Sequence, residues 1–146
     1  MNIKQFMSKD HKDCDLLFAK AEAAVSAEDW TTATQSFNEF IQAMERHLGV
    51  EEQDLFPAFE DATGMKMGPT EMMRMEHDQM RVLFVEMRDA LERQHSDDYL
   101  GIADTLLVMM QQHNMKEEQI LYTMMDQHLS DEEGDWQKKF QDWNAD

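Results

Sequence analysis

The sequence predicts an all-α fold, an antiparallel up-down-up-down four-helix bundle with a short C-terminal helix. Three observations support this class. Apolar residues recur three and four positions apart along the 146 residues, which is the spacing of one face of a helix. Only two prolines and five glycines interrupt the chain, so few positions could end short strands. Much of the sequence also returns after 66 positions, which predicts a pseudo-two-fold internal repeat.

The first half should contain two helices. We expect the first over residues 8–25, and residues 26–29 supply capping side chains for the second. The second helix should continue to about Ala62. Pro57 should kink it, because the proline ring opposes the carbonyl of Gln53.

The second half should repeat this arrangement after a central loop, residues 64–69, which holds two glycines and a proline. Thr70 can cap the third helix, and residues 96–98 open the fourth. Residues 130–133 can cap a short terminal helix. The aromatic side chains that this helix would lay on the bundle are Trp136, Phe140 and Trp143. Short connections between four such helices predict an up-down-up-down bundle.

Length, charge and cysteine content restrict the class of protein. A chain of 146 residues fits a single domain over 1–146. Thirty-one acidic against thirteen basic residues give a net charge of −18, which repels phosphate backbones, so we expect no nucleic-acid partner. No apolar run has the form of a secretory signal or approaches the roughly 20 residues of a membrane span, so we expect no membrane partner. With Cys14 as the single cysteine, we predict a cytoplasmic protein.

The repeat carries a set of residues that commonly bind metals. His11, His47 and Glu51 in the first half correspond to His77, His113 and Glu117 in the second. Their neighbours repeat as well, because the run EEQDLF at 51–56 returns as EEQILY at 117–122. A period of 66 residues exceeds the roughly 30 to 50 residues of helix-pair arrays, so we interpret the copies as two halves of one bundle.

This pattern favours metal binding. In a helix, residues four positions apart lie on one face about 5 to 6 Å apart, so each His–Glu pair presents a nitrogen and a carboxylate at one point. The pairs lie on stripes of Phe, Leu, Ile and Met, where an unpartnered ionised carboxylate would cost several kcal/mol. A cation removes that cost. Imidazole and carboxylate without thiolate suit iron, manganese or zinc, and six ligands exceed the needs of one tetrahedral zinc ion.

We therefore expect two ions. The symmetric assignment gives His11 and His47 to one ion, His77 and His113 to the other, and Glu51 and Glu117 to both. An oxo, hydroxo or water bridge would add a fifth ligand to each ion. One position would remain for a small molecule.

The chain resembles the hemerythrin-like, or HHE cation-binding, domains over nearly its full length. The matching elements are Asp10-His11, the pair His47 to Glu51 with Glu52 and Leu55-Phe56-Pro57, Glu76-His77, and the pair His113 to Glu117 with Glu118 and Leu121-Tyr122. The resemblance implies a non-haem, carboxylate-bridged di-iron centre inside a four-helix bundle. The two iron ions, Fe²⁺ or Fe³⁺, would be held by His11, His47, Glu51, His77, His113 and Glu117.

The resemblance to the oxygen-carrying members is incomplete at two places. Oxygen-carrying hemerythrins have a fifth histidine on the third helix, where this chain has Met73 and Arg81. They also place an aspartate five residues beyond the fourth-helix histidine, where this chain has Glu117 at four and Glu118 at five. The set of four histidines and two glutamates is more similar to the di-iron domain of the iron–sulfur cluster repair proteins.

Two functions remain open, and so does the question of whether the protein is an enzyme. In the first, the centre binds O₂ or a related small oxidant such as nitric oxide or peroxide, for sensing, storage or protection. The alternative is an iron-donating or peroxide-consuming protein related to the cluster repair proteins. A helical interaction module without a working metal is a third interpretation. The expected partner is a small diatomic or peroxide ligand.

Some further side chains have open roles. Glu52 and Glu118 are turned about 100° from the ligands, so we expect them to face solvent or to contact a ligand side chain. Asp15 and Arg81 are equivalent in the repeat and could form an ion pair across the bundle. Tyr122 stands where the first half has a phenylalanine, so it can fill the core or donate a hydrogen bond to a bound ligand.

Overall fold

The computed structural model describes residues 1–129 and 133–143, the side chains of 133–135 excepted. Its segments are α1 Ile3–Ser26, α2 Trp30–Val50, η1 Glu51–Leu55, α3 Phe56–Thr63, α4 Pro69–Glu92, α5 Ser96–Lys116, η2 Glu117–Leu121, α6 Tyr122–His128 and α7 Glu133–Asp142. The two η segments are π-helical turns. Because the described part contains helices and no strand, the all-α class is confirmed.

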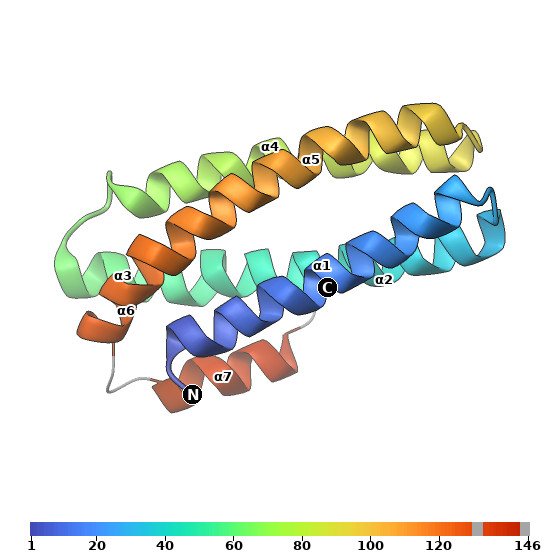
Figure 1. The fold of residues 1–146 in the computed structure, drawn as a ribbon. Helices are drawn as coiled ribbons and strands as arrows, with labels where there is room; N and C mark the ends of the chain where they lie inside the picture. Colours follow the sequence, from blue (N-terminus) through green and yellow to red (C-terminus); the bar gives the residue numbers. More distant parts are fainter. Residues whose placement is uncertain (130–132, 144–146) are drawn as a thin grey trace.

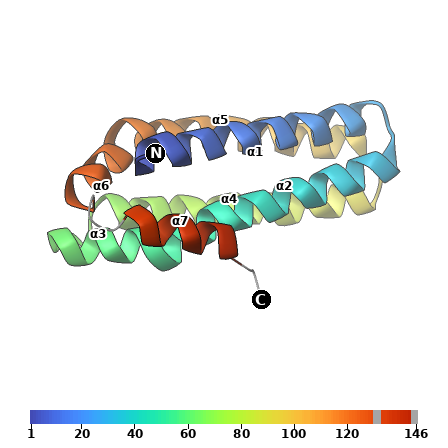
Figure 2. The same ribbon diagram turned by 90° about the horizontal axis from the view of Figure 1, so that it is seen from below.

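Four antiparallel rods form the bundle. Two are the single helices α1 and α4, and two are the composite rods α2–η1–α3 and α5–η2–α6 (Figure 1). Contacts of α1 with α2, α2 with α4, α4 with α5 and α5 with α1 close a ring. Figure 2 shows α1 and α5 along one side of this ring and α2 and α4 along the other. The predicted up-down-up-down bundle is therefore confirmed. None of the described helices is both long and apolar enough to cross a lipid bilayer.

The first helix begins earlier than the sequence predicted. It starts at Ile3 because Asn2 and Gln5 form a capping box. The Gln5 N–H donates to Asn2 Oδ1 at 2.8 Å, and the Asn2 N–H donates to Gln5 Oε1 at 3.2 Å. The second helix begins as predicted, with Asp29 as its N-cap.

The prediction that Thr70 caps the third helix is wrong. That helix begins at Pro69, whose missing N–H is tolerated in a first turn. The Thr70 hydroxyl instead donates to Glu60 Oε2 at 2.6 Å, which ties the start of α4 to the end of α3. The fourth helix begins where predicted, with His95 as its cap. Most of the cap predicted for the terminal helix, residues 130–132, lies outside the described residues.

A buried polar layer divides the core into two apolar clusters. On α1, Met7 belongs to one cluster and Cys14 to the other, and the buried His11 lies between them. The same order occurs on α4 around His77. The polar layer is therefore enclosed by apolar side chains at both ends.

Both composite rods contain a π-helical turn. In the first of them, this turn lies just before Pro57, where the sequence predicted a kink. In η1 the Phe56 N–H donates to the carbonyl of Glu51, and in η2 the Tyr122 N–H donates to that of Glu117. The second half has a threonine in place of the proline, so the proline does not cause the turn. A π turn holds about one extra residue, so positions four and five beyond each glutamate both face the core. The residues at these positions, Leu55, Phe56, Leu121 and Tyr122, are all buried.

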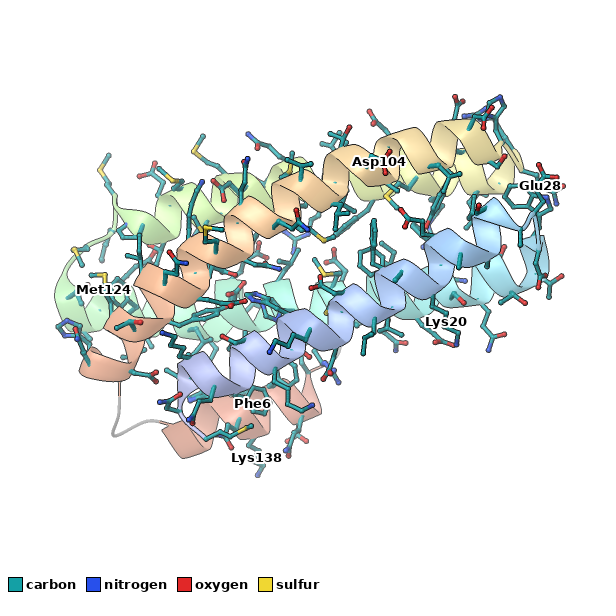
Figure 3. The ribbon with its side chains drawn as sticks, viewed as in Figure 1. Phe6, Lys20, Glu28, Asp104, Met124 and Lys138 are labelled. Atoms are coloured by element: carbon teal, nitrogen blue, oxygen red, sulfur yellow. The ribbon has the colours of Figure 1, made fainter. Side chains whose placement is uncertain are left out.

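The terminal helix α7 packs against the α1–α2 side of the bundle, as predicted (Figure 3). Phe6 makes edge contacts with Trp136 and Phe140, each with ring centroids 5.0 Å apart. The indole of Trp143 lies directly against Gly49, where a Cβ atom would be only 2.5 Å from the ring. Glycine at this position therefore permits the close approach of α7 to α2.

Candidate metal centre

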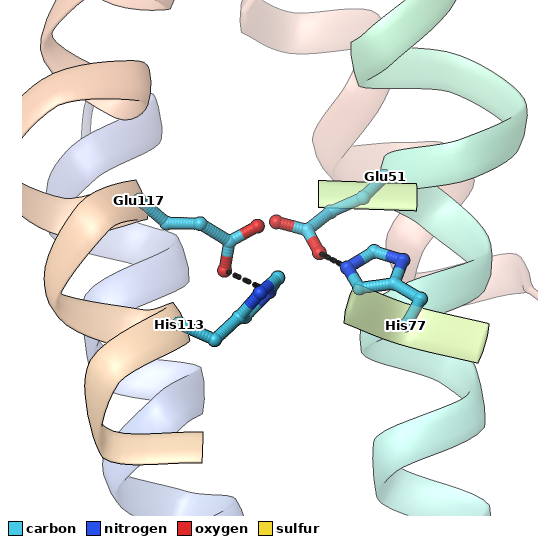
Figure 4. Close-up of side chains that lie close together, drawn as sticks. All are labelled: Glu51, His77, His113 and Glu117. Atoms are coloured by element: carbon cyan, nitrogen blue, oxygen red, sulfur yellow. Dashed lines mark ion pairs between the residues drawn. The ribbon is translucent and has the colours of Figure 1, made fainter. Parts of the chain in front are cut away.

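The six predicted ligands come together in the buried polar layer. They are His11 from α1, His47 from α2, Glu51 from η1, His77 from α4, His113 from α5 and Glu117 from η2. None of the six is more than 5% exposed. Figure 4 shows Glu51 and Glu117 pointing toward each other, each beside a histidine. All four rods thus contribute to one site.

The candidate donor atoms form two overlapping groups. One group contains Glu51, His77, His113 and Glu117, and the other contains His11, His47 and Glu117. Within each group the atoms lie within 4.8 Å of one another. The carboxylate of Glu117 belongs to both groups, and Glu51 Oε2 also lies 3.7 Å from His47 Nε2. The histidines are therefore paired as the symmetric assignment proposes, with a carboxylate between the pairs.

Four atoms of this layer are buried without a hydrogen-bond partner. Buried polar atoms are normally satisfied, so four such atoms in one small volume require an explanation. His77 Nε2, for example, lies 3.2 Å from Glu51 Oε1, yet neither atom has a hydrogen-bond partner. A cation among these lone pairs would bind the atoms that the protein leaves unpaired. The four atoms are Nε2 of His77 and His113, Oε1 of Glu51 and Oε2 of Glu117.

Each imidazole is oriented by a carboxylate at its other ring nitrogen. Such a carboxylate accepts the Nδ1–H bond, which leaves Nε2 available to a metal and makes it more basic. The four Nδ1 contacts join His11 to Glu118 at 2.7 Å, His47 to Asp10 at 2.8 Å, His77 to Glu52 at 2.8 Å and His113 to Glu76 at 2.7 Å. The internal repeat therefore includes the supporting carboxylates as well as the ligands.

Two of these carboxylates, Asp10 and Glu76, were not identified from the sequence, whereas Glu52 and Glu118 were considered. Glu52 and Glu118 were expected to face solvent or contact a ligand, and both contact a histidine. Asp10 and Glu76 had no predicted role. The available signal was that an acidic residue directly precedes the first histidine of each half.

The predicted ion pair between Asp15 and Arg81 is wrong. The Arg81 guanidinium donates two bonds to Glu52, at 2.7 and 2.9 Å, and one to Glu45 at 3.2 Å. The reason is the order of the rods, because α1 and α4 lie diagonally across the ring. Arg81 on α4 faces its neighbour α2, whereas Asp15 on α1 is near Glu118 of η2.

The protein's own carboxylates favour the protonated forms of His11 and His77. Burial lowers the pKa of His11, but hydrogen bonds with Glu117 and Glu118 outweigh burial and raise the pKa to about 10. In the same way, burial lowers the pKa of His77, and the carboxylates of Glu51 and Glu52 raise it to about 9. A metal ion must therefore displace protons from these rings.

The two central carboxylates respond differently to burial. Burial and the charge of Glu117 raise the pKa of Glu51. Burial also acts to raise the pKa of Glu117, but the charge of His113 and bonds with Glu51 and His11 hold it well below its usual value. Before a metal binds, Glu51 is therefore the easier of the two carboxyls to protonate.

Tyr122 makes the centre asymmetric. Its hydroxyl donates to Glu51 Oε2 at 2.7 Å and lies 3.0 Å from Glu117 Oε1. It also lies 3.2 Å from Nε2 of both His11 and His47. The η2 turn makes this possible. In a π turn, the residue five positions beyond Glu117 lies on the same side of the helix as Glu117, whereas in an α-helix it would be rotated from Glu117 by about 140°.

The corresponding side chain in the first half has no hydroxyl. Phe56 stacks on His77, with ring centroids 5.6 Å apart and an angle of 25° between the rings. Burial, followed by the charges of Glu117 and Glu51, raises the pKa of Tyr122 well above its usual value, so the phenol stays protonated. The sequence showed the exchange of Phe for Tyr, but only the π turn shows that the hydroxyl reaches the centre.

We predict that Glu52→Gln weakens metal binding about tenfold, because the neutral amide holds His77 less firmly than a carboxylate does. Glu45→Gln is the matched control, since Glu45 also binds Arg81 but does not contact a ligand histidine. Competition with a chelator for Zn²⁺ measures both affinities. Equal affinities of the two variants would show that the contact with His77 does not support the metal.

Metal affinity should rise with pH. Below a pKa of about 9 for His77 and about 10 for His11, protons occupy these rings and compete with the metal. The affinity is therefore lost as the pH falls, by about two log units per pH unit if both rings release a proton. Calorimetric titration with Zn²⁺ between about pH 6 and 8, in buffers of different ionisation enthalpy, counts the protons released. Affinity that does not depend on pH would contradict this protonation.

Comparison with known proteins agrees with the geometry. Residues 2–125 match the model of the hemerythrin HHE cation-binding domain. An uncharacterised hemerythrin-like protein of Schizosaccharomyces pombe is 29% identical over 132 residues, which cover 90% of this chain and 63% of that protein. The chain thus spans less than two thirds of the length of this relative. No solved structure matches the chain. With the family model matching most of its length, the chain belongs to the hemerythrin HHE cation-binding family.

Proposed function

We propose that the buried layer holds two iron ions, and that this centre binds O₂ or a related small oxidant such as nitric oxide or peroxide. The observation that carries the proposal is the convergence of four Nε2 atoms and two carboxylates, with four of these donors lacking any other partner. Nitrogen and oxygen donors without thiolate suit iron. The single cysteine, Cys14, is in contact with Asp10 at 4.0 Å and belongs to neither donor group.

The assignment of ligands follows from the two donor groups. One ion would be held by His11, His47 and Glu117. The other would be held by Glu51, His77, His113 and Glu117. Membership of both groups makes Glu117 the first candidate for a bridging ligand. The short approach of Glu51 Oε2 to His47 Nε2 makes Glu51 the second.

The surroundings of the donors favour a small ligand. All six candidate ligands are buried, and apolar clusters close the layer on both sides, so a bulky substrate has no room. An iron pair, when bound, supplies the capacity to bind and reduce molecules such as O₂. The Tyr122 hydroxyl can donate a hydrogen bond to a ligand on the side of His11 and His47. Sensing, storage and protection are all compatible with such binding.

After iron-supplemented expression, the aerobically purified protein should contain about two irons per chain and show the near-ultraviolet absorption of a bridged ferric pair. The variant His47→Ala should lose most of this iron. Added metal should also raise its melting temperature less than it raises that of the wild type. His128→Ala is the matched control, because His128 is exposed and outside the layer. A colourless protein that contains only zinc would refute the assignment of iron.

Peroxide consumption is the second candidate function, and Tyr122 is the observation that favours it. Reducing peroxide to water requires protons as well as electrons, and a protonated phenol within 3.2 Å of two ligand nitrogens can deliver one. Iron donation is less well supported by the structure. Complete burial of Glu51 and Glu117 means that release of iron would require the bundle to open.

We expect Tyr122→Phe to retain its iron, because the phenylalanine matches Phe56 of the first half. If the protein consumes peroxide with a proton from this phenol, the rate should fall by at least tenfold, in line with the loss of a general acid. Stopped-flow mixing of the reduced variant and of the wild type with peroxide measures the rate. An unchanged rate with full iron content would exclude Tyr122 as the proton donor.

A further inference from the structure

The terminal helix α7 packs beside the part of the bundle that carries two of the candidate ligands. It contacts α2 and η1, the segments of His47 and Glu51 (Figure 2). The match to the family model ends at Met125, so α7 lies beyond the matched domain. A contact between α7 and the ligand layer is therefore a feature of this chain that the family match does not cover.

One side chain of α7 reaches the ligand layer through an arginine. The guanidinium carbon of Arg46 lies over the ring of Phe140, 4.5 Å from its centroid. The same guanidinium lies 3.9 Å from Asp10 Oδ1. The other oxygen of that carboxylate, Asp10 Oδ2, is 2.8 Å from Nδ1 of the candidate ligand His47. An aromatic ring, a cation, a carboxylate and an imidazole thus form a continuous series from α7 to the centre.

The ring of Phe140 fixes the position of Arg46. At 3.9 Å the contact with Asp10 is an ion pair and not a hydrogen bond. Arg46 Nε is buried, and it has no hydrogen-bond partner in the described part of the chain. A long side chain without such bonds keeps its place by packing, and a guanidinium is attracted to the face of an aromatic ring. Phe140 is itself held, because it is buried and meets the ring of Phe6.

Asp10 depends on this cation because it is nearly enclosed. Only 6% of the residue is exposed, and a buried carboxylate is costly unless it is paired and hydrogen-bonded. The thiol of Cys14, 4.0 Å away, is a weak donor and carries no charge. Loss of Arg46 would therefore weaken the carboxylate's hold on His47.

In the second half of the bundle a lysine takes the role of this arginine. Glu76 holds His113 at 2.7 Å and accepts a bond from Lys116 Nζ at 2.6 Å. The contact between lysine and carboxylate is thus a charge-assisted hydrogen bond, which fixes both groups directly. No aromatic ring is needed to position this cation.

The first half has no lysine at the equivalent position, and α7 packs there instead. A shift of 66 residues pairs Lys116 with Val50, and Gln112 with Arg46. Val50 is buried and belongs to the same apolar cluster as Phe140. The cation of the first half therefore lies one turn earlier on its helix, where the ring from α7 covers it.

We propose that α7 supports one of the two metal ions, the one on the side of His11 and His47. Phe140 and Arg46 are positioning residues, because they act through Asp10 and are not ligands. The inference rests on the proposed two-metal centre. Coupling between two binding equilibria is reciprocal, so occupancy of this ion strengthens the packing of α7 as much as α7 strengthens the ion. Loading of the buried centre is thereby transmitted to a helix at the surface.

Calorimetric titration of the full chain with Zn²⁺ tests the role of the ring. Phe140→Leu keeps an apolar side chain but removes the aromatic face, so it should weaken one of the two ions about threefold to tenfold. Phe140→Tyr keeps the face and should retain the wild-type affinity. Phe37→Leu is the matched control, because Arg88 lies 4.9 Å from the ring of Phe37 in the other apolar cluster. Wild-type affinity of Phe140→Leu, or an equal loss in Phe37→Leu, would overturn the proposal.

Two further backgrounds separate positioning from a general loss of stability. Arg46→Gln introduces the residue of the second half and should itself weaken one ion about tenfold. In that background Phe140→Leu should have no additional effect, because the ring has no cation to hold. In the Lys116→Gln background the effect of Phe140→Leu should persist. The same effect in both backgrounds would show that the ring only stabilises the fold. Circular dichroism verifies that each variant is folded.

Hydrogen exchange of α7 measures the coupling in the opposite direction. The amides of residues 136–142 should exchange several-fold more slowly when Zn²⁺ is bound, and Arg46→Gln should abolish this difference. A wild type that binds no Zn²⁺ would refute the proposed centre, and this inference with it. A wild type that binds two Zn²⁺ ions without a change in the exchange of α7 would refute this inference alone.

Discussion

Six polar side chains lie in the interior between two apolar clusters, and the energetic cost of burying them shapes the rest of the structure. An unpartnered ionised carboxylate in such surroundings costs several kcal/mol. For Glu117, the charge of His113 and bonds with Glu51 and His11 offset part of this cost and lower its pKa, whereas burial and the charge of Glu117 raise the pKa of Glu51. A cation held among these donors would offset more of this cost. Metal binding and the stability of the bundle are therefore coupled.

Support for the polar layer extends outward in steps toward solvent. Each ligand imidazole is held by a carboxylate, and three of the four carboxylates approach a cationic side chain. Arg81 binds Glu52, Lys116 binds Glu76 at 2.6 Å, and Arg46 lies 3.9 Å from Asp10. The charges thus alternate in sign from the centre to the surface. This order keeps the rings in the orientation that directs Nε2 inward.

The two halves share the polar layer but differ where each contacts something else. The π turns occur in both halves, yet only η2 places a hydroxyl in the centre, because Tyr122 replaces Phe56. On the outside, α7 packs on the first half, whereas Met72, Val82 and Val108 of the second half are exposed. The exchange of Phe56 for Tyr122 therefore makes the two ends of the candidate centre chemically different.

The sequence by itself determined the helical class, the repeat and the six candidate ligands, since these depend on spacing along one helix, where residues four apart share a face. It did not determine the partners between rods. Glu118 contacts His11, 107 positions away, and Arg81 binds Glu52 and not Asp15. Both contacts depend on which helices are neighbours in the bundle. The π turns were also missed, because neither their start nor their effect on Tyr122 appears in α-helical periodicity. Only the tertiary structure decided which face of the bundle α7 covers and which face it leaves open.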